Sequence, residues 1–301
     1  METFNAEKLG FETSEDDAYI IDVVNELRND KDVYNYIKAL GLTVKEVKDN
    51  AMKLKDFQDD FNYCKNCPGL KNCNKECPHL RMSLSKLGSY IKVDRQPCEK
   101  IVEQLAQESK YILKDFPENF MDATIESIDI AGAGRQAALR IFNQIINKKS
   151  TKWLYIQGDR KVGKTYLLAT FVNEYLRKND GSAAFVDCKR RIKEFADLSL
   201  KHREEFDQAF ASLTNADILV LDDFGEEYKN EYVRDNVIIP LLSERSHNDK
   251  VTFISSSFLI KDIASMYVIK KGGEIRSQQL EKILLNTCEK EIVLVGNNLY
   301  R

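Results

Sequence analysis

The sequence has little glycine and little proline, and it has no long run of apolar residues. Its 301 residues include 13 glycines and 5 prolines, too few for a collagen-like chain or for long flexible linkers. No stretch approaches the roughly 18 consecutive apolar residues that a membrane helix needs, so we expect no membrane partner. The segment Met1–Phe4 lacks a basic region followed by an apolar run, so we expect no secretory leader and a cytoplasmic location.

The composition of the chain is that of an ordinary globular protein, with 43 % hydrophobic and 31 % charged residues. Its length suits two domains, one of them large enough for a substantial core. The net charge of −3 is unevenly spread, because residues 1–60 carry fifteen acidic and eight basic side chains. An acidic N-terminal module favours docking on a basic protein surface over gripping a phosphate backbone. A well-solvated helical surface would carry the same charge.

Helical spacing dominates the first sixty residues, and strands alternate with helices further on. Apolar residues from Ala18 to Leu27 recur at helical spacing, and Thr43 with Glu46 forms a possible capping box. Tyr90–Val93 fits a short strand, and Pro97–Ser109 fits a connecting helix. Short apolar runs that read as buried strands are Trp153–Gln157, Ala183–Asp187, Asp217–Leu221 and Val251–Ser255. This alternation predicts an α/β fold, with a parallel sheet between helices in residues 111–301, preceded by a small helical domain in residues 1–110.

The segment Gly158–Thr165 matches the phosphate-loop pattern G-x-x-x-x-G-K-[ST] in full. An apolar run precedes it and a helical pattern follows it, as this motif requires. Turned backbone N–H groups and the helix N-terminus suit phosphates, so we expect ATP here. Lys164 is expected at the β- and γ-phosphates and Thr165 at Mg²⁺. The expected nucleotide-binding residues are Gly158, Asp159, Arg160, Lys161, Val162, Gly163, Lys164, Thr165 and Tyr166.

A second apolar run, Ile218–Leu221, ends in two acidic residues, Asp222 and Asp223. Adjacent carboxylates with no neighbouring Lys or Arg in the sequence repel each other unless a cation lies between them. We therefore expect Asp222 to hold Mg²⁺, directly or through water, and Asp223 to orient the attacking water. A surface turn is the alternative interpretation.

Four cysteines lie close together in the sequence, followed by a histidine: Cys64, Cys67, Cys73, Cys77 and His79. Disulfides are rare in cytosolic proteins, and soft thiolates in a tetrahedral set select zinc. The cluster therefore predicts a zinc site whose fourth ligand is either Cys77 or His79, and redox pairing is the main alternative. The other cysteines are scattered: Cys98, Cys188 and Cys288.

Taken together, these motifs resemble those of the primosomal helicase loaders of the DnaI type, in the DnaC/DnaI branch of the AAA+ ATPases. The matching segments are Cys64–Leu70, Phe116–Pro117, Gly134–Leu139, Gly158–Thr165 and Leu221–Gly225. The resemblance implies a protein that loads the hexameric replicative DNA helicase onto single-stranded DNA. It also implies a homo-oligomer when ATP or the helicase is bound, and helicase docking by about residues 1–105.

The resemblance also implies two further site residues. AAA+ proteins place a polar residue at the tip of the next strand to sense the γ-phosphate, which here is Ser257 or Ser256. An arginine from a neighbouring subunit often contacts the same phosphate, and Arg276 is the candidate. Many AAA+ ATPases carry Glu at the position of Asp223, so the shorter Asp indicates slow hydrolysis, typical of a switch.

Three alternatives to a helicase loader remain open. A nucleotide-gated adaptor would bind ATP without hydrolysing it. A transposition-helper ATPase of the same branch would share the ATPase motifs, although such proteins generally lack the cysteine cluster. A sequence-specific DNA-binding zinc protein is disfavoured by the acidic residues 1–60.

Overall fold

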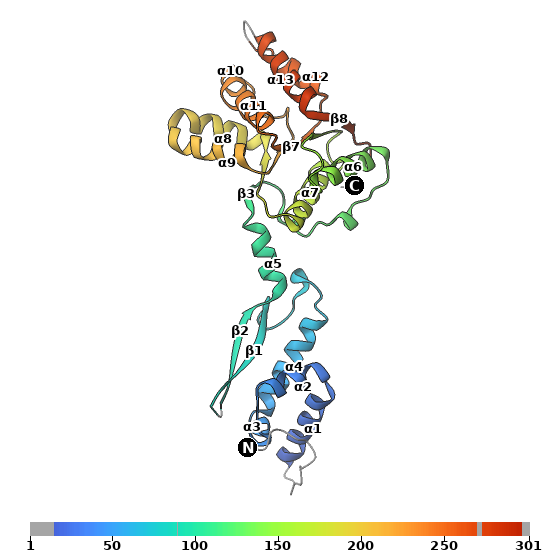
Figure 1. Cartoon of the computed structure of the whole chain (residues 1–301), viewed down its shortest axis with the longest axis vertical. Helices are drawn as coiled ribbons and strands as arrows, with labels where there is room; N and C mark the ends of the chain where they lie inside the picture. Colours follow the sequence, from blue (N-terminus) through green and yellow to red (C-terminus); the bar gives the residue numbers. More distant parts are fainter. Residues whose placement is uncertain (1–14, 89, 270–272, 297–301) are drawn as a thin grey trace. The chain divides into compact units, whose positions relative to one another are not determined.

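The computed structural model describes residues 15–88, 90–269 and 273–296, so Met1–Phe4, examined above for a leader, lies outside the described residues. The chain divides into two compact units, Met1–Ala106 and Gln107–Arg301 (Figure 1). Each unit has its own hydrophobic core. Within the described ranges, none of the helices is long and apolar enough to cross a bilayer.

The N-terminal unit combines helices with an antiparallel hairpin. Its elements are α1 (Glu15–Asn29), α2 (Lys31–Ala39), α3 (Val44–Asp49), α4 (Ala51–Lys65), a 3₁₀ turn (Leu70–Asn72), β1 (Leu80–Leu87) and β2 (Tyr90–Pro97), followed by α5 (Glu99–Glu108). The predicted capping box is confirmed, because Thr43 Oγ1 accepts the Glu46 N–H at 3.3 Å and Glu46 Oε2 accepts the Thr43 N–H at 2.7 Å.

The expected strand Tyr90–Val93 is found within β2 and the expected connecting helix coincides with α5, but the other hairpin strand, β1, was not predicted in the small helical domain. Apolar residues alternate with polar ones along β1. This period of two places Leu84 on the buried face of the hairpin, which packs against the helices. Leu84 and Ile91 pack with Leu54 and Phe57 of α4 in a single core. The hairpin therefore contributes to the core on which the helices pack.

The C-terminal unit is built on a six-stranded parallel sheet in the order β3-β5-β6-β7-β4-β8. Its strands are β3 (Tyr111–Lys114), β4 (Trp153–Gln157), β5 (Ala183–Asp187), β6 (Ile218–Asp222), β7 (Val251–Ser256) and β8 (Cys288–Val293). The predicted parallel α/β fold is confirmed, with each of the four predicted strands found within one residue of its expected bounds. The edge strands β3 and β8 were not predicted.

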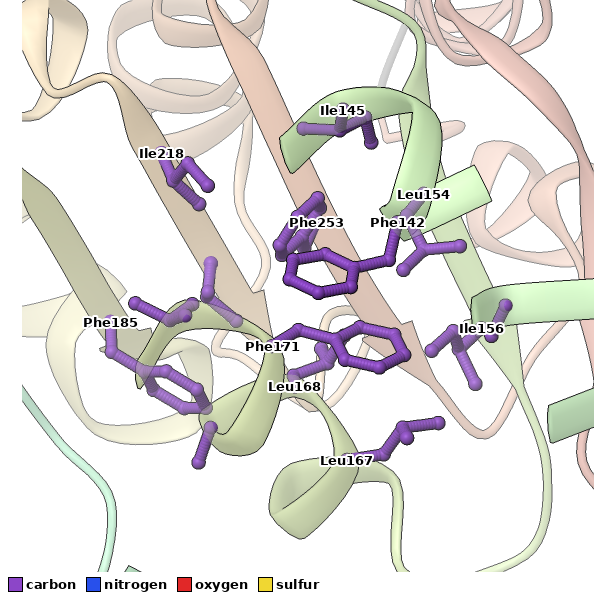
Figure 2. Close-up of a cluster of buried hydrophobic side chains, with 14 of the residues drawn as sticks. Phe142, Ile145, Leu154, Ile156, Leu167, Leu168, Phe171, Phe185, Ile218 and Phe253 are labelled. Carbon is purple, nitrogen blue, oxygen red and sulfur yellow. The ribbon is translucent and has the colours of Figure 1, made fainter. Parts of the chain in front are cut away.

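Helices cover both faces of this sheet. They are α6 (Ala133–Ile146), α7 (Lys164–Lys178), α8 (Cys188–Lys201), α9 (Arg203–Asn215), α10 (Glu231–Val233), a π-helix (Arg234–Ile238), α11 (Ile239–His247), α12 (Ile260–Met266) and α13 (Gly273–Thr287), with 3₁₀ turns at Glu118–Phe120 and Ile125–Ser127. One core lies under α6 and α7, where Phe142 and Phe171 stack with their ring centroids 4.3 Å apart (Figure 2). The other core lies on the opposite face, under α8 to α13.

The strand order determines what meets at the carboxyl edge of the sheet. Strand β7 lies between β4, which leads into the phosphate loop, and β6, which ends in the acidic pair. The register aligns Gln157 with Ser256 and Leu221 with Ile254. Consequently, the phosphate loop, the tip of β7 and the two aspartates come together at one edge.

Candidate functional site

The phosphate loop, which connects β4 to α7, contains two residues in the left-handed backbone conformation, which few residues adopt. Lys161 has a φ of 68° and Gly163 a φ of 91°, both in the left-handed region. At Gly158 an added Cβ would lie 2.6 Å from the carbonyl oxygen of Leu294, so only glycine fits there. These turns direct the loop into the N-terminus of α7, which is the arrangement that suits an anion.

Lys164 carries the buried cation of this loop. Its side chain is almost fully buried, with 5 % of the residue exposed, and its Nζ donates to the carbonyls of Gly158 at 2.7 Å and Asp159 at 2.9 Å. Burial lowers the pKa of Lys164, and the nearby carboxylates of Asp223 and Asp222 oppose that shift. A desolvated ammonium at a helix N-terminus fits a phosphate chain, whose charge would offset the cost of burial.

Thr165 and Asp222 meet across the site. The Thr165 hydroxyl donates to Asp222 Oδ2 at 2.8 Å, and Asp222 is only 6 % exposed. Burial raises the pKa of Asp222 to about 6, and the hydrogen bonds from Ser255 and Thr165 oppose that rise. A hydroxyl and a carboxylate side by side at a phosphate loop are oxygen ligands of the kind that Mg²⁺ takes, so these residues fit that ion.

Asp223 begins a tight turn at the end of β6. Its φ of 53° is left-handed, and its carbonyl accepts the Glu226 N–H at 3.0 Å. Its own N–H donates to Ser255 Oγ at 3.0 Å, and Ser255 Oγ in turn donates to Asp222 Oδ1. Ser255 thus holds both aspartates, a role that the sequence analysis missed although this serine lies in the same Ser-Ser-Ser run.

The other two serines of that run differ in their contacts. Ser256 Oγ donates to the Phe224 carbonyl at 2.6 Å and accepts the Phe258 N–H at 3.0 Å, so it is committed to the backbone. Ser257 Oγ is buried and has no hydrogen-bond partner among the residues that the structure describes. The Ser256 carbonyl accepts the Gly158 N–H at 3.1 Å, which bonds the end of β7 to the phosphate loop. Ser257 is the next residue after this bonded strand end.

Three other residues expected to bind the nucleotide connect the loop to neighbouring segments of the chain. Arg160 Nη2 lies 2.6 Å from Glu226 Oε2, which links the loop to the turn after Asp223. The Val162 carbonyl accepts a hydrogen bond from Arg135 at 3.1 Å. The Tyr166 hydroxyl is hydrogen-bonded to Ser127 at 2.7 Å.

Arg276 lies apart from this group, on α13. Its side chain is 52 % exposed, and its Nε lies 3.7 Å from Asp235 Oδ1. Within its own subunit, the guanidinium also donates to Gln279 at 2.9 Å.

The cysteine segment follows α4, and it places thiols around one cavity of the N-terminal unit. The cavity is lined by Cys64, Cys67, Cys73, His79 and Cys98, among others. The four cysteines among these residues are free thiols, with no disulfide between them. Cys77 instead lines a neighbouring cavity with acidic residues of α4, whereas the other four cysteines and His79 are not among the residues lining that cavity.

Cys98 is the donor that the sequence analysis left out. The β1–β2 hairpin returns the chain to His79, whose carbonyl accepts the Cys98 N–H at 2.8 Å. His79 Nε2 is hydrogen-bonded to the Leu70 carbonyl at 3.0 Å, a contact of the kind that orients metal-binding histidines. Across the described ranges, however, no three His, Cys, Asp or Glu side chains converge closely enough to hold a metal ion.

Comparison with known proteins points to one kind of relative. No protein-family model matches the chain. The replicative helicase loader DnaI of Bacillus subtilis (strain 168) is 25 % identical over 254 residues, which cover 81 % of this chain and 81 % of that protein. A crystal structure of DnaI superposes with a TM-score of 0.53 and 26 % identity, covering 64 % of this chain and 98 % of that one. The resemblance to helicase loaders of the DnaI type, predicted from the motifs, is confirmed along most of the chain.

Proposed function

We propose that this chain is an ATP-switched loader that binds the hexameric replicative DNA helicase and helps place it on single-stranded DNA. The similarity to a protein named as a replicative helicase loader supports the helicase as partner. The observation that carries the ATP switch is the 2.8 Å contact between Thr165 and Asp222 beside the buried Lys164. In the proposal, the chain forms homo-oligomers when ATP or the helicase is bound.

Each site residue has one task in this proposal. The loop Gly158–Thr165 binds the phosphates, and Lys164 neutralises the β- and γ-phosphates. Thr165 and Asp222 hold Mg²⁺, which supplies positive charge against the phosphate oxygens. Asp223 orients the attacking water, and Ser257 offers its unpartnered hydroxyl to the γ-phosphate. Arg276 acts on the nucleotide of a neighbouring subunit.

A second candidate function is a nucleotide-gated adaptor that binds ATP without hydrolysing it. The observation that favours it is Asp223, which is short and sits in left-handed backbone at the end of β6. Single-turnover hydrolysis, measured with and without single-stranded DNA, separates the two functions. Release of phosphate supports the loader, and binding without release supports the adaptor.

The N-terminal unit carries the zinc in this proposal. Cys64, Cys67 and Cys98 supply three ligands, and either Cys73 or His79 supplies the fourth, because all five line the same cavity. The metal would tie the end of α4 to the base of the hairpin and add folding energy there. We propose that this unit docks on the helicase through about residues 1–105, and that Cys77 is outside the ligand set.

Co-purification tests the partner directly. The full-length protein is mixed with the host's replicative helicase in the presence of ATP, ADP or no nucleotide, and the complex is isolated by size-exclusion chromatography. The Lys164→Ala variant is the matched control, since it keeps the N-terminal unit and loses the phosphate contact. Complex formation that depends on nucleotide in the wild type, and loses that dependence in the variant, supports the loader. Absence of any complex in all three states refutes it.

A further inference from the structure

Glu227 is a buried carboxylate that the nucleotide site does not use. It lies just beyond the turn that begins at Asp223 and is only 3 % exposed. Its Oε2 accepts the Gly225 N–H at 2.7 Å, and its Oε1 accepts the Tyr267 hydroxyl at 2.6 Å. The Lys229 ammonium lies 3.7 Å away. A carboxylate taken out of water at this depth requires such partners, so Glu227 rigidly joins the turn to Tyr267.

Gly225 connects Glu227 to the catalytic end of the sheet. Its φ of 98° is left-handed, and an added Cβ would lie 2.9 Å from the Phe258 ring, so glycine is required. The preceding residue, Phe224, donates its N–H to the Ser255 carbonyl at 2.8 Å. The Gly225 peptide is therefore held between the strand that contacts both aspartates and the Glu227 carboxylate.

Tyr267 continues the contacts away from the nucleotide. It is fully buried, and its carbonyl accepts a hydrogen bond from Arg234 Nη1 at 3.1 Å. Arg234 opens the π-helix Arg234–Ile238, and π-helical segments are frequent at functional sites. The same guanidinium donates to the Ile269 carbonyl at 3.2 Å, so Arg234 also holds the segment that follows α12.

Asp235 carries the contacts on to Arg276. Both of its carboxylate oxygens accept from the Arg234 guanidinium, at 2.8 and 2.7 Å, and Oδ1 lies 3.7 Å from Arg276 Nε. Asp235 lies on the π-helix Arg234–Ile238, which leads directly into α11, and α11 packs against α13 on the same face of the sheet (Figure 1). Because half of the Arg276 side chain is exposed, its guanidinium is accessible to a second copy of the chain.

We propose that Glu227, Tyr267, Arg234 and Asp235 form a relay that couples the nucleotide site of one subunit to the position of the Arg276 that this subunit offers to its neighbour. The four are positioning residues, and the ligand that they serve is a nucleoside triphosphate bound to an adjacent copy. The inference rests on the proposed function, since it requires ATP turnover in an assembly. It adds a physical link through which the nucleotide bound to one subunit would affect ATP turnover in the next subunit.

The test is the Tyr267→Phe variant, which removes one hydrogen bond to a buried carboxylate and leaves the ring in place. Loss of such a bond changes an equilibrium on the order of tenfold, so assembly-dependent turnover falls about tenfold while the Kd for ATP stays unchanged. Tyr111→Phe is the matched control, because the Tyr111 hydroxyl also donates to a side chain, Asn173 Oδ1, at 2.7 Å. Its turnover equals that of the wild type, and thermal melting shows that both variants are folded.

A mixing experiment separates positioning of Arg276 from damage to the variant's own site. Asp223→Asn subunits, which bind ATP without turning it over, are added to Tyr267→Phe subunits and supply a correctly placed Arg276. Recovery of turnover in the mixture supports the relay. No recovery despite co-assembly, or wild-type turnover in Tyr267→Phe alone, overturns the relay and leaves the proposed function standing. A wild-type protein without ATP turnover overturns both.

Discussion

Three consecutive serines at the end of β7 allow one substitution to be made three times with different expected results. Ser255 Oγ donates to Asp222 and accepts the Asp223 N–H. Ser256 Oγ bonds to two neutral backbone groups, and Ser257 Oγ is buried without a hydrogen-bond partner among the described residues. The change to alanine removes the same hydroxyl in each case, so the contacts alone set the outcome.

The expected loss in the free energy of unfolding depends on which hydrogen-bonding groups lose their partner when each hydroxyl is removed. Ser255→Ala deprives a buried carboxylate of a donor and a backbone N–H of its acceptor, which should lower the free energy of unfolding by about 3 kcal/mol. Ser256→Ala loses two neutral hydrogen bonds, at a cost of about 1–2 kcal/mol. Ser257→Ala loses no hydrogen bond within the described residues, so its stability should stay within about 0.5 kcal/mol of the wild type.

Denaturant titration and thermal melting of the three full-length variants measure this order. For a unit of this size, about 3 kcal/mol corresponds to a Tm lowered by roughly 6–12 °C. Turnover should follow a different order, since Ser257→Ala is expected to slow hydrolysis of saturating ATP while leaving the fold at wild-type stability. The reasoning is refuted if Ser257→Ala unfolds as easily as Ser255→Ala, or if it keeps wild-type turnover.

Four further predictions concern the proposed site. Lys164→Ala should abolish ATP binding with the fold intact, because Lys164 is the buried cation at the loop that we assign to the β- and γ-phosphates; unchanged affinity in a nucleotide titration would contradict it. Asp223→Asn should keep Mg²⁺·ATP bound and suppress hydrolysis, which a phosphate-release assay checks against wild-type turnover. Purified protein should carry about one zinc per chain by elemental analysis, lost in Cys98→Ser and retained in Cys77→Ser; equal zinc content in both variants would refute the ligand set. Arg276→Ala should bind ATP as a monomer and lose assembly-dependent turnover, and mixing it with Lys164→Ala should restore activity if the two variants co-assemble.

The central strands could be predicted because both faces of each are buried. Ile218–Leu221 and Trp153–Ile156 are short, apolar and rich in β-branched or aromatic residues, which is typical of the middle of a parallel sheet. The edge strand β8 reads Cys-Glu-Lys-Glu-Ile-Val and is half exposed. Charged side chains on an edge strand hide the strand pattern in the sequence, so β8 was missed. The hairpin strand β1 was missed although its alternation is visible.

The features of the proposed sites that the sequence did not reveal depend on contacts between distant segments. Cys98 reaches the cavity of Cys64 and Cys67 only because the hairpin brings the chain back to His79. Spacing in the sequence favoured Cys77, which is nearer along the chain and faces the neighbouring cavity. Likewise, the sequence cannot distinguish the three consecutive serines. Their hydrogen bonds distinguish them, because Ser255 bonds to Asp222 and Asp223 at the end of β6, whereas the Ser257 hydroxyl has no partner among the described residues.

The electrostatics of the two buried charges explain why this edge of the sheet suits a nucleotide. Burial lowers the pKa of Lys164 and raises that of Asp222 to about 6, so both groups are pushed toward neutrality by desolvation. A core that served stability alone would gain from apolar residues at both positions. A triphosphate beside the ammonium and a divalent cation beside the carboxylate would each supply the missing opposite charge. Under the proposed function, binding of Mg²⁺·ATP would therefore recover the cost of burying these groups, and the site would gain affinity from groups that weaken the free fold.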